Sequence, residues 1–272
     1  MNILKCLAGS KWGQDKETIV TTHKTIVRST LEYAAPIWAP IISKTSVQKL
    51  QNVQNQALRL ATGNLRMAHT DHIHRETKVL PVQQHTNLIT KQFVANFFLP
   101  GHPGAKHLGR PPEPRKMKNS ALSHTNELRN KLPNGFIDMK AIKTVQKSVH
   151  TDTVKNTLDS YTVNRVLAIN PPEINNNEAK LSRETRTELS RLRSGFSRKL
   201  NSYMSRIDPT IEDKCPQCSS TPHDTTHLFN CPANPSQMNV LSLWTDPVKA
   251  ANFLELSAKN DDSYPLEKKK AK

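Results

Sequence analysis

The sequence has little glycine, few aromatic residues, few cysteines and no long hydrophobic run. Its 272 residues include 8 glycines, 4 cysteines and 5% aromatic residues, against 18 prolines, and hydrophobic residues make up 35%. No apolar stretch approaches the roughly 20 residues that span a bilayer. The apolar start of the chain is also too short for a secretory signal. We therefore expect a helix-and-loop protein with disordered parts, inside the cell in the nucleus or cytoplasm, with reduced cysteines.

Acidic residues are scarce as well. Lys and Arg number 39 against 23 Asp and Glu, which leaves a net charge of +16. Such an excess favours a polyanionic partner, and nucleic acid is the commonest one. The alternative is a highly soluble basic protein without an anionic partner. A chain of this length can hold one large or two small domains.

One short stretch has the spacing of a metal site. Two cysteines three positions apart are followed by a histidine and a third cysteine four positions apart, a C-x2-C-x8-H-x3-C pattern made by Cys215, Cys218, His227 and Cys231. Residues four apart share one face of a helical turn, and three thiolates with one imidazole are a common ligand set for structural Zn²⁺. His223 competes with His227, but Cys231 lies too far beyond it. A disulfide between two of the cysteines is the other alternative.

A fully protein-ligated zinc leaves no position for a reactive water, so this metal is expected to be structural rather than catalytic. The remaining cysteine, Cys6, is expected to be an ordinary buried thiol or the end of an incomplete element. No other catalytic signature stands in the sequence, because there is no Walker loop and no G-x-S-x-G motif.

Amphipathic spacing predicts four helices within residues 1–100. The first covers 15–35, with Ile26 among its inward residues, and Pro36 ends it. The second is capped by Thr45 or Ser46 and closed by Gly63. A short helix over 70–80 precedes a longer one that Pro81 opens. His72 and His74 lie about 200° apart on a helix, so they are expected at the surface and not on one metal.

The second half of the chain is more polar. Residues 101–118 hold four prolines and five basic residues, which predicts an extended linker, and residues 119–180 show only weak helical patterns. Residues 182–206 predict a strongly basic helix, with seven basic residues: Arg183, Arg186, Arg191, Arg193, Arg198, Lys199 and Arg206. Guanidinium groups pair well with phosphate oxygens, so these seven are the candidate nucleic-acid contacts. A merely solvated charged face is the alternative.

Beyond Cys231, apolar spacing predicts one or two closing helices with Asp246 as a cap, and residues 257–272 form a basic tail that is expected to be disordered. The expected fold is therefore mainly α. It has a helical bundle over 1–100, a basic linker over 101–180, and a small zinc-binding helical module over 181–256.

Several motifs together resemble the region that follows the polymerase palm in jockey-like non-LTR retrotransposon reverse transcriptases. They are the runs Trp12–Thr18, Leu31–Trp38, Leu50–Arg59 with Thr62-Gly63, His72–Pro81, Leu189–Gly195 and the Cys/Cys/His/Cys knuckle with Leu241-x-Leu243-Trp244. The resemblance is strong over 10–100 and 181–256 and weak between. It implies thumb-like helices and a zinc-bearing module that grip template RNA or target DNA.

Catalysis by this chain alone is not expected. A reverse transcriptase palm holds two Mg²⁺ ions on three carboxylates, and the only Asp-Asp pair, Asp261-Asp262, lies in a polar tail without flanking strands. The expected function is a non-catalytic, nucleic-acid-binding part of an RNA-directed DNA polymerase. The alternatives are a zinc-stapled protein-interaction module and a decayed element product. No membrane or small-molecule partner is expected.

Overall fold

The structure is a computed structural model that describes residues 2–9, 13–108, 121–133, 135–235 and 237–256. It is mainly helical, which confirms the expected fold class, and the described residues contain no strand beyond an isolated bridge between Ala8 and Gly13. The chain divides into two compact units. Unit 1 comprises Met1–Lys5, Glu17–Leu58 and Thr70–Thr162, and unit 2 comprises Cys6–Lys16, Arg59–His69 and the described residues from Val163 onward. The expected tail over 257–272 and most of the linker over 101–118 lie outside the described residues.

The N-terminal helix α1 (Asn2–Leu7) is followed by a longer helical run that contains a π-helical segment. α2 (Lys16–Thr22) continues through the π-helical residues His23–Arg28 into α3 (Ser29–Leu31). A π-helical turn contains one residue more than an α-helical turn. The residues after it are therefore rotated relative to a regular α-helix, and Arg28 lies on the buried side. Ile26, expected to face inward, is 48% exposed, whereas Arg28 is 6% exposed.

Four further helices of the first hundred residues follow closely on this run. They are α4 (Ala35–Trp38), α5 (Lys44–Thr62), α6 (Thr70–Thr77) and α7 (Val82–Ala95). The backbone N–H of Ser46 donates to Ser43 Oγ at 3.2 Å, so the side-chain cap of α5 comes from Ser43, earlier than expected. Gly63 ends α5 with a φ of 70°, as predicted. Pro81 stands at the N-cap of α7, which confirms where that helix begins.

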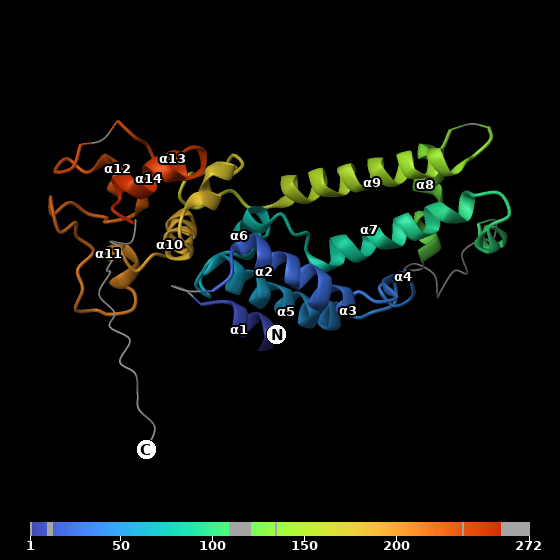
Figure 1. The fold of residues 1–272 in the computed structure, drawn as a ribbon, viewed down its shortest axis with the longest axis horizontal. Helices are drawn as coiled ribbons and strands as arrows, with labels where there is room; N and C mark the ends of the chain where they lie inside the picture. The colour runs from blue at the N-terminus through green and yellow to red at the C-terminus, as the bar shows by residue number, and fades with distance from the viewer. Residues whose placement is uncertain (1, 10–12, 109–120, 134, 236, 257–272) are drawn as a thin grey trace, which may run out of the picture. The chain divides into compact units, whose positions relative to one another are not determined.

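The region expected to be a weakly helical linker contains a long, regular helix. α8 (Thr125–Lys131) and α9 (Met139–Ser160) follow short 3₁₀ turns at Asn96–Phe98, Pro103–His107 and Ala121–His124. Figure 1 shows α9 running beside α7. Ile142, Val145 and Val149 recur at helical spacing, and all are buried in a core with Leu88 and Val94 of α7. This apolar stripe explains why the segment folds despite its polar composition.

Unit 1 buries a polar cluster that the hydrophobic pattern alone does not reveal. Arg28 Nε donates to Glu32 Oε1 at 2.9 Å, and His85 Nδ1 lies 2.7 Å from Glu32 Oε2. Desolvation opposes the charge of Glu32, but His85 and Arg28 outweigh it and lower the pKa of this carboxyl.

The expectation that His74 lies at the surface is wrong, because this residue is 3% exposed and its ring bonds to Val79 O and Asn55 Oδ1.

Unit 2 packs short helices around one hydrophobic core. Its helices are α10 (Arg183–Ser194), α11 (Asn201–Met204), α12 (Thr225–Asn230), α13 (Ser242–Thr245) and α14 (Pro247–Phe253), after a 3₁₀ turn at Asn176–Lys180. The core gathers Leu189, Leu192, Leu200, Phe229, Leu243 and Trp244. Asp246 Oδ1 accepts the backbone N–H of Lys249 at 3.3 Å, which confirms the predicted cap of α14.

The single basic helix expected over 182–206 is interrupted. Gly195 adopts a left-handed φ of 72° and its N–H bonds to Leu192 O, which ends α10 as a glycine C-cap does. The chain then continues without helix until α11 begins at Asn201. The basic residues therefore lie on two separate segments rather than along one face.

Candidate metal centre

The four predicted ligands come together in unit 2. One ligand atom from each of Cys215, Cys218, His227 and Cys231 lies within 4.8 Å of all the others. Cys215 Sγ lies 3.8 Å from Cys231 Sγ, and Cys218 Sγ lies 3.3 Å from His227 Nε2. The ligand spacing in the sequence predicts that these four side chains come together, and the geometry supports this prediction.

These distances fit a tetrahedral metal better than a covalent link. With a Zn–S bond of about 2.3 Å and tetrahedral angles, two thiolates on one zinc stand roughly 3.8 Å apart. A disulfide needs about 2.05 Å between sulfurs, and all four cysteines are free. The disulfide alternative therefore does not hold for Cys215 and Cys231. The donor set and its spacing fit zinc, with all four coordination positions supplied by the protein.

Local backbone hydrogen bonds hold both halves of the cluster, the Cys215–Cys218 pair and the His227–Cys231 pair. The N–H of Cys215 donates to Ser220 O and the N–H of Ser219 donates to Cys215 O, both at 2.9 Å, so the first two cysteines sit in a closed knuckle. Ser219 has a φ of 59°, which places it in the left-handed region. On the other side, Asp224 caps α12 by accepting the N–H of His227 at 2.8 Å. The sequence signal for this cap is an Asp three residues before the ligand histidine, because Asp is a preferred N-cap residue.

The thiol groups of the cluster differ in their acidity. Hydrogen bonds from Ser220 hold the pKa of Cys218 at about 6, so this sulfur is ready to act as a thiolate near neutral pH. Burial raises the pKa of Cys231 above its ordinary value. A divalent cation would offset that penalty, because metal ligation requires the deprotonated sulfur.

The competing histidine has a different role. His223 Nδ1 accepts the backbone N–H of Asn201 at 3.1 Å, and His223 O accepts the N–H of Ser202. Asn201 Nδ2 also donates to Lys214 O at 2.6 Å. These bonds join the start of α11 to the loop that carries the cysteines. His223 thus ties the metal loop to the chain segment that follows Arg198 and Lys199.

Three of the seven candidate nucleic-acid contacts are buried and bonded to the protein itself. Arg183 donates to the carbonyls of Leu60 and Ala61 at the C-terminal end of α5. Arg186 pairs with Asp15. Arg193 is 0% exposed, and its guanidinium donates to Leu243 O and to Glu178 Oε1. Their burial does not suit a phosphate contact, because each guanidinium already donates to backbone carbonyls or to a carboxylate of the protein.

The other four candidates stand at or near the surface. Arg191 is partly buried, with Nε donating to Gly63 O at 3.0 Å and Nη1 near Glu188 at 3.4 Å. Arg198, Lys199 and Arg206 are exposed. These three flank the segment that Asn201 fastens to the metal loop, so their backbone is held by the same structure that holds the cluster. Cys6, expected to be buried, is exposed.

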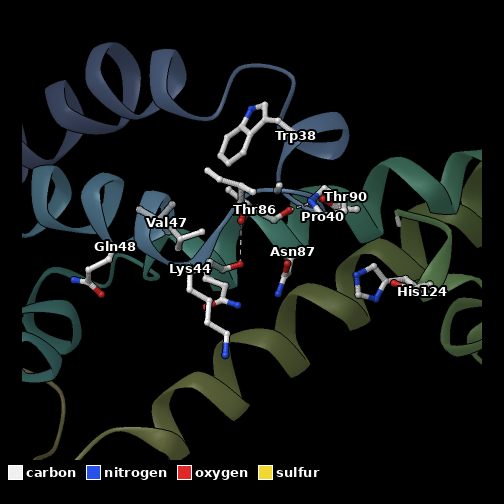
Figure 2. A pocket seen from close by; sticks show the side chains of 14 residues that line it. Trp38, Pro40, Lys44, Val47, Gln48, Thr86, Asn87, Thr90 and His124 are labelled. Carbon is white, nitrogen blue, oxygen red and sulfur yellow. Dashed lines mark hydrogen bonds between the residues drawn. The ribbon is translucent and has the colours of Figure 1, made fainter. Parts of the chain in front are cut away.

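Unit 1 contains a separate pocket of about 510 Å³. Figure 2 shows Trp38 and Pro40 on one side, Thr86 and Asn87 of α7 beside them, and Lys44 and His124 at the edges. Burial and the nearby Lys91 lower the pKa of His124. None of the described residues that line the pocket carries a carboxylate or a thiol, so it offers no carboxylate ligands for Mg²⁺ and no thiol nucleophile.

No protein-family model, curated protein or solved structure matches this chain. Among the helices of the described residues, none combines the length and the hydropathy that crossing a bilayer requires.

Proposed function

We propose that the chain is a nucleic-acid-binding protein in which a structural zinc ion organises a basic surface segment. The observation that carries the proposal is the convergence of Cys215, Cys218, His227 and Cys231 within 4.8 Å. Closed sites with four protein ligands stabilise folds rather than perform chemistry. The zinc would fix the loop from Lys214 to Cys231, and through it the neighbouring chain segment.

The link from metal to surface runs through Asn201. Its N–H and its side-chain amide bond to His223 Nδ1 and Lys214 O. Arg198 and Lys199 precede it by two or three residues and Arg206 follows it, and all three side chains are exposed. A fixed backbone lets cations meet phosphates with less loss of conformational entropy. The net charge of +16 adds long-range attraction to any polyanion.

The resemblance in the motifs makes the proposal more specific. We propose that the chain corresponds to the non-catalytic, post-palm part of a non-LTR retrotransposon reverse transcriptase, and that it binds template RNA or target DNA. Leu189 and Leu192, which belong to the motifs that carry that resemblance, pack in the same core as Trp244, and so does Phe229, which lies between His227 and Cys231. The partly buried Arg191 and the exposed Arg198, Lys199 and Arg206 are the proposed phosphate contacts of this unit.

A fluorescence-anisotropy titration tests the proposal. The zinc-loaded full chain is titrated against a structured RNA and against duplex DNA at low salt. Substituting Arg198, Lys199 and Arg206 with Gln should weaken binding and lower the slope of log K against log salt by about 2 to 3. The matched control replaces Arg66, Lys180 and Lys249, three exposed cations elsewhere in unit 2. Absence of binding to both probes at low salt would remove the proposal.

One observation favours a second candidate function, a protein-interaction module. Tyr33, Ile37 and Ile41 are 82%, 73% and 76% exposed. Three large apolar side chains this close in sequence are unusual on a solvated surface. If the chain binds a partner protein through these three side chains, substituting Tyr33, Ile37 and Ile41 with Ser should abolish partner binding and leave RNA affinity unchanged. Pull-down of a defined partner beside the RNA titration separates the two functions.

A further inference from the structure

Helix α9 presents a cationic face on which no acidic residue of the helix itself lies. Between Lys140 and His150 the exposed residues are Lys140, Lys143, Thr144, Lys147, Ser148 and His150. At 3.6 residues per turn, the three lysines and His150 fall within an arc of about 80°. Asp152 and Asp159 point about 140° to 160° away from the middle of that arc. Within the described residues the three lysines form no ion pair, whereas Asp152 is paired with Lys131.

The same helix is held firmly on its opposite face. Ile142, Val145 and Val149 are at most 3% exposed and pack into the core shared with α7. Gln146 Nε2 donates to Gln92 O at 3.0 Å and to Asn96 Oδ1 at 3.1 Å. Asp138 caps the first turn by accepting the N–H of Ala141 at 2.7 Å. The lysines therefore project from a rigid surface, with Lys140 and Lys147 about 10 Å apart along the axis.

We propose that this face of α9 is a binding surface for the phosphodiester backbone of a nucleic acid. The proposal rests on the proposed function and adds a contact in unit 1 to the one in unit 2. Ammonium groups bind phosphates as point charges without demanding a base sequence. The surface is therefore a positioning contact that does not read sequence, and it lies in a region that composition alone presents as a linker.

Two other anionic partners fit the face less well. A protein interface has an apolar or aromatic centre, whereas the exposed residues from 140 to 150 are only Lys, Thr, Ser and His, and the exposed apolar side chains of Phe136 and Met139 lie at the end of the face before Lys140. A helix that lies on a membrane inserts its apolar side into the lipid, but the apolar side of α9 is buried against α7. Charge complementarity without an apolar centre is the condition that a phosphate backbone meets.

The test compares two triple variants of the zinc-loaded full chain. The first replaces Lys140, Lys143 and Lys147 with Gln. The control replaces Lys24, Lys49 and Lys106, three exposed lysines of unit 1 that lie on other elements. Circular dichroism and zinc content verify that both variants fold. Anisotropy titrations with duplex DNA and with an RNA hairpin, from 50 to 300 mM salt, then give the slope of log K against log salt.

We expect the α9 variant to lose about 2 to 3 units of slope, since each lost phosphate contact removes roughly 0.7 to 0.9. The control should retain most of the wild-type slope. An α9 variant that matches the control would overturn this inference and leave the proposed function standing, whereas a wild-type chain that binds neither probe overturns both. Loss of binding to anionic vesicles or to a poly-Glu peptide, with nucleic-acid binding unchanged, would also overturn it.

Discussion

Replacement of Arg193 by Gln separates an interior role for this arginine from a role at phosphate. Its Nε and Nη2 donate to Leu243 O at 2.9 and 2.6 Å, and Nη1 donates to Glu178 Oε1 at 2.7 Å. The guanidinium carbon also lies 5.9 Å from the centre of the Trp244 ring. Gln cannot reach both partners, so Leu243 O loses its donors and Glu178 keeps only Lys16, whose Nζ lies 3.3 Å from Oε2. Breaking a buried pair costs about 3 to 5 kcal/mol in the free energy of unfolding, and because Lys16 still offsets part of the charge of Glu178 we expect the lower end, about 3 kcal/mol.

Urea unfolding of the zinc-loaded full chain measures this loss. Release of zinc to a colorimetric chelator reports on unit 2, while far-UV circular dichroism follows both units. The matched control is Arg198→Gln, which removes the same charge from an exposed position and should change the free energy of unfolding by no more than about 0.5 kcal/mol. Glu178→Gln combined with Arg193→Gln should be far from additive, because the two residues form one pair.

The interior role of Arg193 is refuted if the free energy of unfolding of Arg193→Gln lies within about 1 kcal/mol of that of the control and the variant binds RNA as weakly as Arg198→Gln does. Arg193 would then face phosphate, as its position in a basic stretch suggests. Retained RNA affinity in the fraction that remains folded supports the interior role.

Three further predictions follow from other sites. Purified chain should hold one zinc ion, and Cys231→Ser should lower that stoichiometry in metal analysis; a metal-free wild type would contradict the site. Burial and Arg28 lower the pKa of His23 to about 4, below its unfolded value of 6.5. The contribution of neutral His23 to the free energy of unfolding is therefore complete above pH 6.5, and it falls by up to about 3 kcal/mol as the pH is lowered toward 4. His23→Leu should for that reason flatten the dependence of the unfolding free energy on pH. A Cβ on Gly63, at φ +70°, would lie 2.3 Å from Thr187 Cγ2, whereas one on Gly101, at φ +77°, meets nothing within 4 Å; Gly63→Ala should therefore lower Tm more than Gly101→Ala.

The gathering of the four candidate metal ligands and most helices of the first hundred residues could be predicted because their signals are local. Ligand spacing in Cys215–Cys218 and His227–Cys231, and glycine at the end of α5, depend on a few neighbouring residues. The mainly α fold follows from the same apolar periods. Even where the predicted helix was right, the π-helical turn at His23–Arg28 changed which side chains are buried.

The burial of the arginines could not be read from the sequence because it depends on distant partners. Arg183 meets carbonyls more than 120 positions earlier, and Arg186 meets Asp15, 171 positions earlier. A count of charges along 182–206 cannot distinguish such residues from exposed Arg198. The regular lysines of α9 did carry a local signal, their i, i+3, i+7 spacing, which the low apolar content of the surrounding segment obscured.

Unit 2 is assembled from stretches separated by most of the chain, and this ordering has a consequence for synthesis. Residues 6–16 and 59–69 leave the ribosome long before α10, whose Arg183 donates to the carbonyls of Leu60 and Ala61 near the end of α5. The unit cannot close until translation has passed the final core residues near Leu256. A shortened gene that begins at codon 163 would omit two of the three stretches, and its product should be captured by chaperones or degraded.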